Sequence, residues 1–450
     1  MNLIYGIKDK PKFAQMLLFA FQQVLAILAA TITVPAIVGN GMSAAAALFG
    51  AGVGTLVYQL FTKFKSPVFL GSSFAFIGPM LAAFAGGVSM SLGYLGLILG
   101  AVFAGLVYVI IALVVKLAGT KWIDKVMPAC VIGPTVALIG LSLAGAAVND
   151  VFSYGAKTTF GISSYFIMDT AAWVSLACAL VTLLVVVLVS TYGKKMAKLI
   201  PFIIGIAAGY VTATIFTLIG EATGNAAMKV IDFSLFQNMN ILAVPEFTFL
   251  EAFKGIGELT FNRVITILVA YVPVAFVVFA EHLADHKNLS SIIGSDLLED
   301  PGLHCTLLGD GIGSMAGAFF GGCPNTTYGE SVGCVAITRN ASVITITTAA
   351  IMCIIISFFG PFVAFLDSFP GCVMGGVCVT LYGFIAVSGL KMIQKVDLNK
   401  NSNLFTVAVI LIPGIGGMAM GIGEVYITTT ACALILGILV NIMLSKSKEA

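Results

Sequence analysis

A cluster of ionisable side chains lies at the end of one long apolar run. Glu281 follows 17 uncharged residues, Val264 to Ala280, and His282, Asp285 and His286 come soon after it. On a helix, Asp285 lies one turn from Glu281 on the same face, and the two histidines share a neighbouring face. An ionisable group inside a bilayer is costly, so it is treated as functional by default. Glu281, Asp285 and His286 are therefore candidate functional residues.

Two further carboxylates, Glu330 and Asp310, lie in apolar segments of the second half of the chain. Glu330 can bind substrate and exchange a proton, or it can simply cap a helix N-terminus. Asp310 is expected to hydrogen bond across helices, and Glu281 has the alternative of pairing with a helix end. His282 and His286 are equally compatible with hydrogen-bonded packing.

The composition excludes several classes of protein. Of the 450 residues, 59% are hydrophobic and 9% are charged, and the formal net charge is +2. A soluble chain carries roughly 25% charged residues, so a cytosolic enzyme, a disordered chain and a nucleic-acid binder are excluded. Nine cysteines without a C-x-x-C pair indicate packing. We find no nucleophile–base pair, phosphate loop or metal-ligand set, so the sequence predicts no enzyme and no cofactor.

The elements that position these groups are predicted to be transmembrane helices. An apolar run of about 20 residues spans a bilayer, and we predict seven segments on each side of a more polar stretch at 221–262. Their approximate bounds are 13–39, 43–62, 67–87, 90–115, 126–147, 171–192, 199–220, 264–284, 301–320, 321–337, 341–366, 370–390, 403–421 and 425–444.

The basic residues support this topology. With the N-terminus inside and one crossing per segment, 18 of the 22 Lys and Arg residues fall on the cytoplasmic side, as the positive-inside rule requires. Twelve or thirteen spans with one re-entrant pair remain the alternative.

Two local patterns recur in the same order. The Gly-rich run 48–55 is similar to 307–314, and the Pro-containing run 128–133 is similar to 370–375. Because seven segments separate the copies, the second copy would enter the membrane from the opposite side, which is an inverted-topology repeat. The predicted fold class is therefore an all-α polytopic membrane protein of 14 transmembrane segments in two inverted 7-segment repeats, at 1–220 and 263–450.

The third and tenth segments are interrupted by Gly and Pro, from Pro67 to Pro79 and from Gly321 to Gly333. Each fits a short β-strand break followed by a half-helix, with the half-helices beginning near Phe74 and Gly329. Their N-terminal amides would be donors at membrane depth, and paired broken helices indicate a transporter site.

The signature residues are most similar to one family. The run Pro324-Asn-Thr-Thr-Tyr-Gly-Glu330, continuing to Arg339, resembles the signature of the nucleobase–ascorbate transporter (nucleobase:cation symporter-2) family in its uracil permease form. The runs Ala280–His282, Asp300–His304, Leu70–Phe76 and Leu381–Gly383 are similar to the same family. The resemblance extends over about residues 12–445.

The resemblance implies proton-coupled import of uracil, by alternating movement of a core domain against a gate domain that interleave the two repeats. Glu281 and Glu330 would bind the base and take part in proton coupling, and amides at Phe74 and Gly329 would donate to its carbonyls. The other implied substrate-binding residues are Tyr328, Ser73, Ala30 and Tyr382. Two positions depart from the family pattern. Gln23 stands where many members carry His, and Asp285 stands where some uracil permeases carry His. Asp285 and His286 are the candidates to replace that second His in proton coupling, with protons as the coupling ion.

Three alternatives remain open: a xanthine or uric acid permease of the same family, an anion exchanger or channel of the same fold, and, with little support, a membrane receptor. The implied partners are a nucleobase, protons and the lipid bilayer, with no nucleic acid, and a homodimer is left open. The implied location is the inner (cytoplasmic) membrane with both termini in the cytoplasm.

Overall fold

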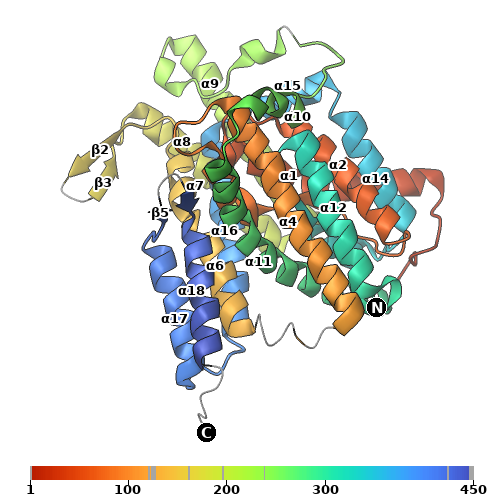
Figure 1. The fold of residues 1–450 in the computed structure, drawn as a ribbon. Helices are drawn as coiled ribbons and strands as arrows, with labels where there is room; N and C mark the ends of the chain where they lie inside the picture. Colours follow the sequence, from red (N-terminus) through yellow and green to blue (C-terminus); the bar gives the residue numbers. More distant parts are fainter. Residues whose placement is uncertain are drawn as a thin grey trace. The chain divides into compact units, whose positions relative to one another are not determined.

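The structure is a computed structural model that describes residues 3–119, 122, 128–160, 163–194, 197–237, 239–422 and 425–444. Figure 1 shows that helices make up most of it. The helices are α1 Phe13–Val38, α2 Ala44–Phe61, α3 Ile77–Phe84, α4 Met90–Ala118, α6 Ala129–Ser142, α7 Ala144–Val151, α8 Thr170–Tyr192, α9 Pro201–Thr223, α10 Thr248–Ala252, α11 Phe261–Ile293, α12 Leu303–Gly321, α13 Gly329–Thr338, α14 Val343–Ile356, α15 Gly360–Asp367, α16 Gly371–Ile393, α17 Asn401–Ile415 and α18 Thr429–Leu444.

Short elements complete the fold. The strands are β1 Leu70–Ser72, β2 Lys157–Phe160, β3 Ser163–Phe166, β4 Asn325–Thr327, β5 Met420–Ile422 and β6 Val425–Ile427. Single turns are η1 Phe74–Phe76, η2 Ala197–Leu199, η3 Ala226–Met228, η4 Phe233–Phe236, η5 Phe253–Glu258 and η6 Leu298–Gly302.

Eight helices of the described chain are long and apolar enough to cross a membrane. They are Phe13–Val38, Ala44–Phe61, Met90–Ala118, Ala129–Val151, Thr170–Tyr192, Pro201–Thr223, Phe261–Ile293 and Gly371–Ile393. Shorter apolar helices lie at Phe74–Phe84, Val343–Ile356, Asn401–Ile415 and Thr429–Leu444. Many large apolar side chains on these helices are exposed, as expected for helices that face lipid.

Several predicted boundaries were wrong. The eighth segment does not end near 284, because α11 continues to Ile293 with His282, His286 and Leu289 buried along one side. The eleventh segment is divided into α14 and α15, and the polar stretch at 221–262 contains η3, η4, α10 and η5. The count of fourteen segments and their orientation stay predictions. Lys121, Lys125, Lys195, Lys446 and Lys448, which entered the count of basic residues, lie outside the described residues.

The chain divides into two compact units. Unit 1 comprises Met1–Ser142, Val244–Phe358 and Ile385–Ala450, and unit 2 comprises Leu143–Ala243 and Phe359–Phe384. In unit 2, α8 packs closely along α9. A Cβ atom added at Gly205 would lie only 2.3 Å from Val186 Cγ2. Strands β2 and β3 form a hairpin in which Lys157 pairs with Phe166.

In unit 1, the two Gly-rich runs of the sequence pack against each other through α2 and α12. A Cβ atom at Gly50 would lie 2.4 Å from the Gly317 carbonyl oxygen, and one at Gly54 would lie 2.7 Å from the Gly313 carbonyl oxygen. Only glycine permits this backbone approach, and small residues at such spacing are typical of membrane helix interfaces. The contact brings equivalent runs from the two halves of the chain together.

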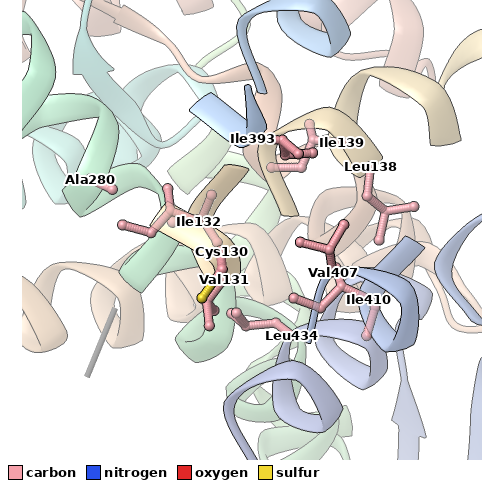
Figure 2. Packing of buried hydrophobic residues seen from close by; sticks show 12 residues of the cluster. Cys130, Val131, Ile132, Leu138, Ile139, Ala280, Ile393, Val407, Ile410 and Leu434 are labelled. Carbon is pink, nitrogen blue, oxygen red and sulfur yellow. The ribbon is translucent and has the colours of Figure 1, made fainter. Parts of the chain in front are cut away.

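A hydrophobic cluster in unit 1 packs next to Glu281. It joins α6, α11, α17 and α18 with the C-terminal end of α16, and Figure 2 shows most of its side chains. Its members are Cys130, Val131, Ile132, Leu138, Ile139, Val277, Ala280, Ile393, Val407, Ile410, Ala433 and Leu434, with Ala75 packed against them. Because Ala280 precedes Glu281 and Ala75 follows Phe74, this cluster supports both positions.

Candidate functional site

Two short strands bring the starts of two helical segments together. Strand β1 pairs antiparallel with β4, with Gly71 opposite Thr326. The Ser73 amide donates to the Pro324 carbonyl over 2.9 Å, and the Tyr328 amide donates to the Phe69 carbonyl over 3.2 Å. η1 begins at Phe74, immediately after β1, and α13 begins at Gly329, immediately after β4.

The start of a helix can bind an anion or the negative end of a dipole. The first amides of a helix have no partner within it, and the N-terminal end carries partial positive charge. Gly329 is exposed, and a Cβ atom there would meet only Asp285 Oδ1, at 3.8 Å. The segment in front of β1 is tied to α13 by Ser331, whose Oγ accepts from the Phe69 amide over 3.0 Å.

The carboxylates gather beside these helix starts. Glu281 is exposed on α11, and its charge lies within range of Asp285, Glu330 and Asp310. Asp285 is fixed by Thr327, whose Oγ1 donates to Asp285 Oδ2 over 2.9 Å. Glu330 lies in the first turn of α13. The structure therefore brings Glu281, Asp285 and Glu330 to one part of unit 1, next to Gly329.

His282 and Asp310 form a buried pair. His282 Nδ1 lies 2.7 Å from Asp310 Oδ2, and His282 Nε2 lies 3.0 Å from Thr306 Oγ1. The Thr306 hydroxyl donates its hydrogen to the Leu303 carbonyl, so it accepts from His282 Nε2–H. One proton therefore lies between Nδ1 and Oδ2, held either as imidazolium and carboxylate or as imidazole and carboxylic acid.

His286 belongs to a second buried group. Its Nδ1 donates to the His282 carbonyl over 2.8 Å, and its Nε2 lies 2.7 Å from the Tyr58 hydroxyl. The Tyr58 hydroxyl in turn lies 2.7 Å from Ser66 Oγ. The rings of His282 and His286 stack with centroids 4.0 Å apart, and the hydrogen bonds described for the two rings lead to different partners. His286 thus faces Tyr58 rather than the carboxylates on the other side of α11.

The remaining predicted site residues fall in different surroundings. Tyr328 is buried and its hydroxyl donates to the Ser72 carbonyl over 2.8 Å. Ser73 and Ala30 are also buried, and α1, which carries Ala30, packs against α13 and β1. Tyr382 is buried in unit 2, so its predicted place in the site stays a prediction.

Gln23, the residue that departs from the family pattern in the first segment, is buried and donates through Nε2 to the Ser331 carbonyl over 3.4 Å. It therefore supports α13 near Glu330. Sequence reasoning did not find Tyr58, Thr306 or Thr327 as partners of the ionisable groups. Thr327 lies inside the signature run and could have been found there, whereas nothing in the sequence distinguishes Tyr58 or Thr306.

A family profile described as "Permease family" matches residues 14–422. The chain belongs to this permease family. It is 36% identical over 99% of its length to the uracil permeases of Bacillus caldolyticus and of Bacillus subtilis, and covers 96% of each. It is 34% identical over 96% of its length to the uracil permease of Escherichia coli K12, of which it covers 92%. The permease is therefore an integral, multi-pass membrane transporter.

Solved structures of the same fold are anion carriers. The murine Solute Carrier 26 family member A9 anion transporter matches 97% of this permease and 69% of its own chain, with a TM-score of 0.64 and 12% identity. The transmembrane domain of the cyanobacterial bicarbonate transporter BicA matches 98% and 100%, with a TM-score of 0.63 and 16% identity. These likenesses establish the fold alone.

Proposed function

We propose that this permease imports uracil together with a proton. The observation that carries the proposal is the 36% identity, over 99% of the chain, to two uracil permeases. The same chemistry is favoured by the surroundings of Gly329, where donors and acceptors lie together.

Uracil needs both kinds of hydrogen-bonding partner. Its two ring N–H groups need acceptors, which Glu281 and Glu330 supply, and its two carbonyls need donors, which the amides of Phe74 and Gly329 supply. Tyr328, Ser73 and Ala30 line the same site, and Tyr382 closes it. A site of this kind rejects analogues that lack one partner, because a buried polar group is then left unpaired.

Proton coupling follows from the crowding of carboxylates. Glu281, Asp285 and Glu330 lie close enough for their charges to repel, and a proton bound to one of them relieves the repulsion. Glu330 is the coupling residue that we favour, with Glu281 and Asp285 contributing. His286 contributes if the proton leaves along the contact between His286 and Tyr58.

The proposed architecture has 14 transmembrane segments in two inverted repeats, with both termini in the cytoplasm and 221–262 on the outer face of the inner membrane. Access to the site would alternate as a core domain moves against a gate domain. The pairing of β1 with β4 and of α2 with α12 supports the repeat. The compact units, each built from separate stretches of chain, support interleaved domains.

The test is uptake of labelled uracil into proteoliposomes with an imposed pH gradient, acidic outside. We expect saturable accumulation that a protonophore abolishes, and liposomes without protein give the background. Uracil accumulation that does not depend on the pH gradient would contradict proton coupling, and uracil would remain the proposed substrate.

Two other functions are separated by the same assay. A xanthine or uric acid permease would show stronger competition by xanthine than by unlabelled uracil. An anion exchanger or channel of the same fold is the other alternative, and it would carry chloride or sulfate without any nucleobase.

A further inference from the structure

The half-helix α3 ends in a partly exposed turn, where Ala83 is buried and Ala85 is exposed. The last four carbonyls of any helix have no partner within it, and a buried carbonyl without a hydrogen bond is costly. Here the carbonyls of Ala82, Ala83 and Ala85 lie at the C-terminal end of the helix. How these groups are satisfied decides how firmly α3 is held along its axis.

One buried side chain satisfies all three carbonyls. Arg263, in the first turn of α11, is 7% exposed. Its Nη1 donates to the Ala85 carbonyl over 3.2 Å, and its Nη2 donates to the carbonyls of Ala82, over 3.3 Å, and of Ala83. Arg263 takes part in none of the ion pairs of the described residues.

A buried cation without a counter-charge is unusual, because its desolvation is expensive. The negative end of the α3 dipole and three carbonyl oxygens take the place of a carboxylate. The contact is therefore directional, and it fixes one end of the helix to α11.

The opposite end of the same apolar helical segment, Phe74–Phe84, carries the amide that the proposed function assigns to a uracil carbonyl. Side-chain packing holds this segment laterally, since Phe76 stacks on Tyr271 at 5.6 Å and Phe84 meets Tyr94 edge-on at 5.5 Å. Apolar contacts of this kind are non-directional and define the axial position weakly. At the near end, the Ser73 amide donates to the Pro324 carbonyl over 2.9 Å, so strand pairing restrains the Phe74 end. The hydrogen bonds of Arg263 are the directional contacts at the far end.

The other half-helix, α13, is held at its far end by backbone instead. The Ile4 amide donates to the Arg339 carbonyl over 2.7 Å, and the Ala341 amide donates to the Tyr5 carbonyl over 2.9 Å. Ser342 Oγ adds a bond of 2.5 Å to the Asp9 carbonyl. A substitution at Arg263 should therefore disturb α3 and leave α13 in place.

We propose that Arg263 is a positioning residue for substrate recognition, which sets the axial position of α3 and so the placement of the Phe74 amide against one carbonyl of the base. The inference rests on the proposed function. It predicts a selective defect, in which recognition of one carbonyl weakens while recognition of the other, at Gly329, is kept.

The experiment compares competition by 2-thiouracil and 4-thiouracil, each of which replaces one carbonyl oxygen by a weaker acceptor and keeps both N–H groups. For each variant, the inhibition constant of the thio analogue is divided by that of uracil. In Arg263→Gln, we expect uracil affinity to fall roughly three- to ten-fold, the effect of one neutral hydrogen bond. The ratio for one analogue should move toward one, and the ratio for the other should stay at the wild-type value.

Three variants complete the design. Arg263→Lys keeps the charge and part of the hydrogen bonding, so it should recover part of the lost affinity. Lys254→Gln removes an exposed positive charge whose partner is Glu251, and should leave both ratios unchanged. Ser342→Ala, at the far end of α13, should not alter the ratio that responds to Arg263.

A loss of affinity with both ratios unchanged, or a loss of protein abundance alone, would mean that Arg263 only stabilises the fold. If Arg263→Gln does not accumulate, the same ratios measured in Arg263→Lys decide the question. Absence of saturable uracil uptake by the wild-type protein would refute the proposed function, independently of Arg263.

Discussion

The substitution Gly71→Ala tests whether Tyr328 shapes the binding site. A Cβ atom at Gly71 would lie 2.3 Å from Tyr328 Cε2 and 2.4 Å from Cζ. Carbon atoms in contact are separated by about 3.5 Å, so the ring must retreat by about 1 Å. The strand cannot move away easily, because Gly71 is paired with Thr326 on β4.

We expect two effects of this displacement. Overpacking of a buried contact costs about 1–3 kcal/mol of folding free energy, which lowers the melting temperature in detergent without preventing folding. Misplacement of a site residue by about 1 Å weakens recognition by roughly ten- to a hundred-fold, which is a free-energy change of similar size. The measurements are uracil affinity by displacement of labelled uracil and melting temperature by a thermal shift assay.

Gly78→Ala is the matched control. It makes the same substitution in α3, where an added Cβ atom would meet nothing within 4 Å, and it should bind uracil as the wild-type protein does. Wild-type affinity in Gly71→Ala, despite a lower melting temperature, would refute the assignment of Tyr328 to the wall of the site.

Three further substitutions test the carboxylates. Glu281→Gln should reduce uracil affinity at least ten-fold, because an amide accepts and donates where the base needs an acceptor. The measurement is displacement of labelled uracil, with the exposed Asp232→Asn as the control. An unchanged affinity would exclude contact between Glu281 and the base. Glu330→Gln should abolish accumulation driven by an acid-outside gradient while counterflow exchange continues, and equal loss of both would indicate a plain binding role. Thr327→Val removes the hydrogen bond to Asp285, which is worth about 1.5–3 kcal/mol when the acceptor is charged. The dependence of uracil uptake on external pH should therefore shift. An identical pH profile would show that Asp285 does not exchange the coupling proton.

The sequence located the ionisable groups because their residue types are out of place among apolar neighbours. Glu281, Asp310 and Glu330 are conspicuous for that reason, and the two interrupted segments are conspicuous through their Gly and Pro residues. Local composition is enough to detect such groups, since the cost of charge in a membrane depends on the neighbours along the helix.

The hydrogen-bonding partners of these groups could not be predicted from local composition. His286 contacts Tyr58, which is 228 residues away, and such a contact depends on how α2 packs against α11 rather than on either segment alone. The strands β1 and β4 have three residues each, which is too short for an alternating pattern to appear. Their pairing joins residues from the two halves of the chain, so no local pattern reveals it.

The length of α11 was underestimated because polar residues were taken as its end. His282, His286 and Leu289 are buried on one side while Lys287 and Asn288 are exposed on the other, so the helix continues with an amphipathic face after its apolar part. Burial by neighbouring elements, which the sequence does not display, overrides the local polarity.

The pairing of β1 with β4 has a consequence for release of cargo. Both helix starts follow strands of one two-stranded sheet, so the sheet limits how far the two starts can separate. Under the proposed function, uracil is then released without separation of the two strands. Its release is governed by the uracil concentration and by the proton occupancy of the carboxylates.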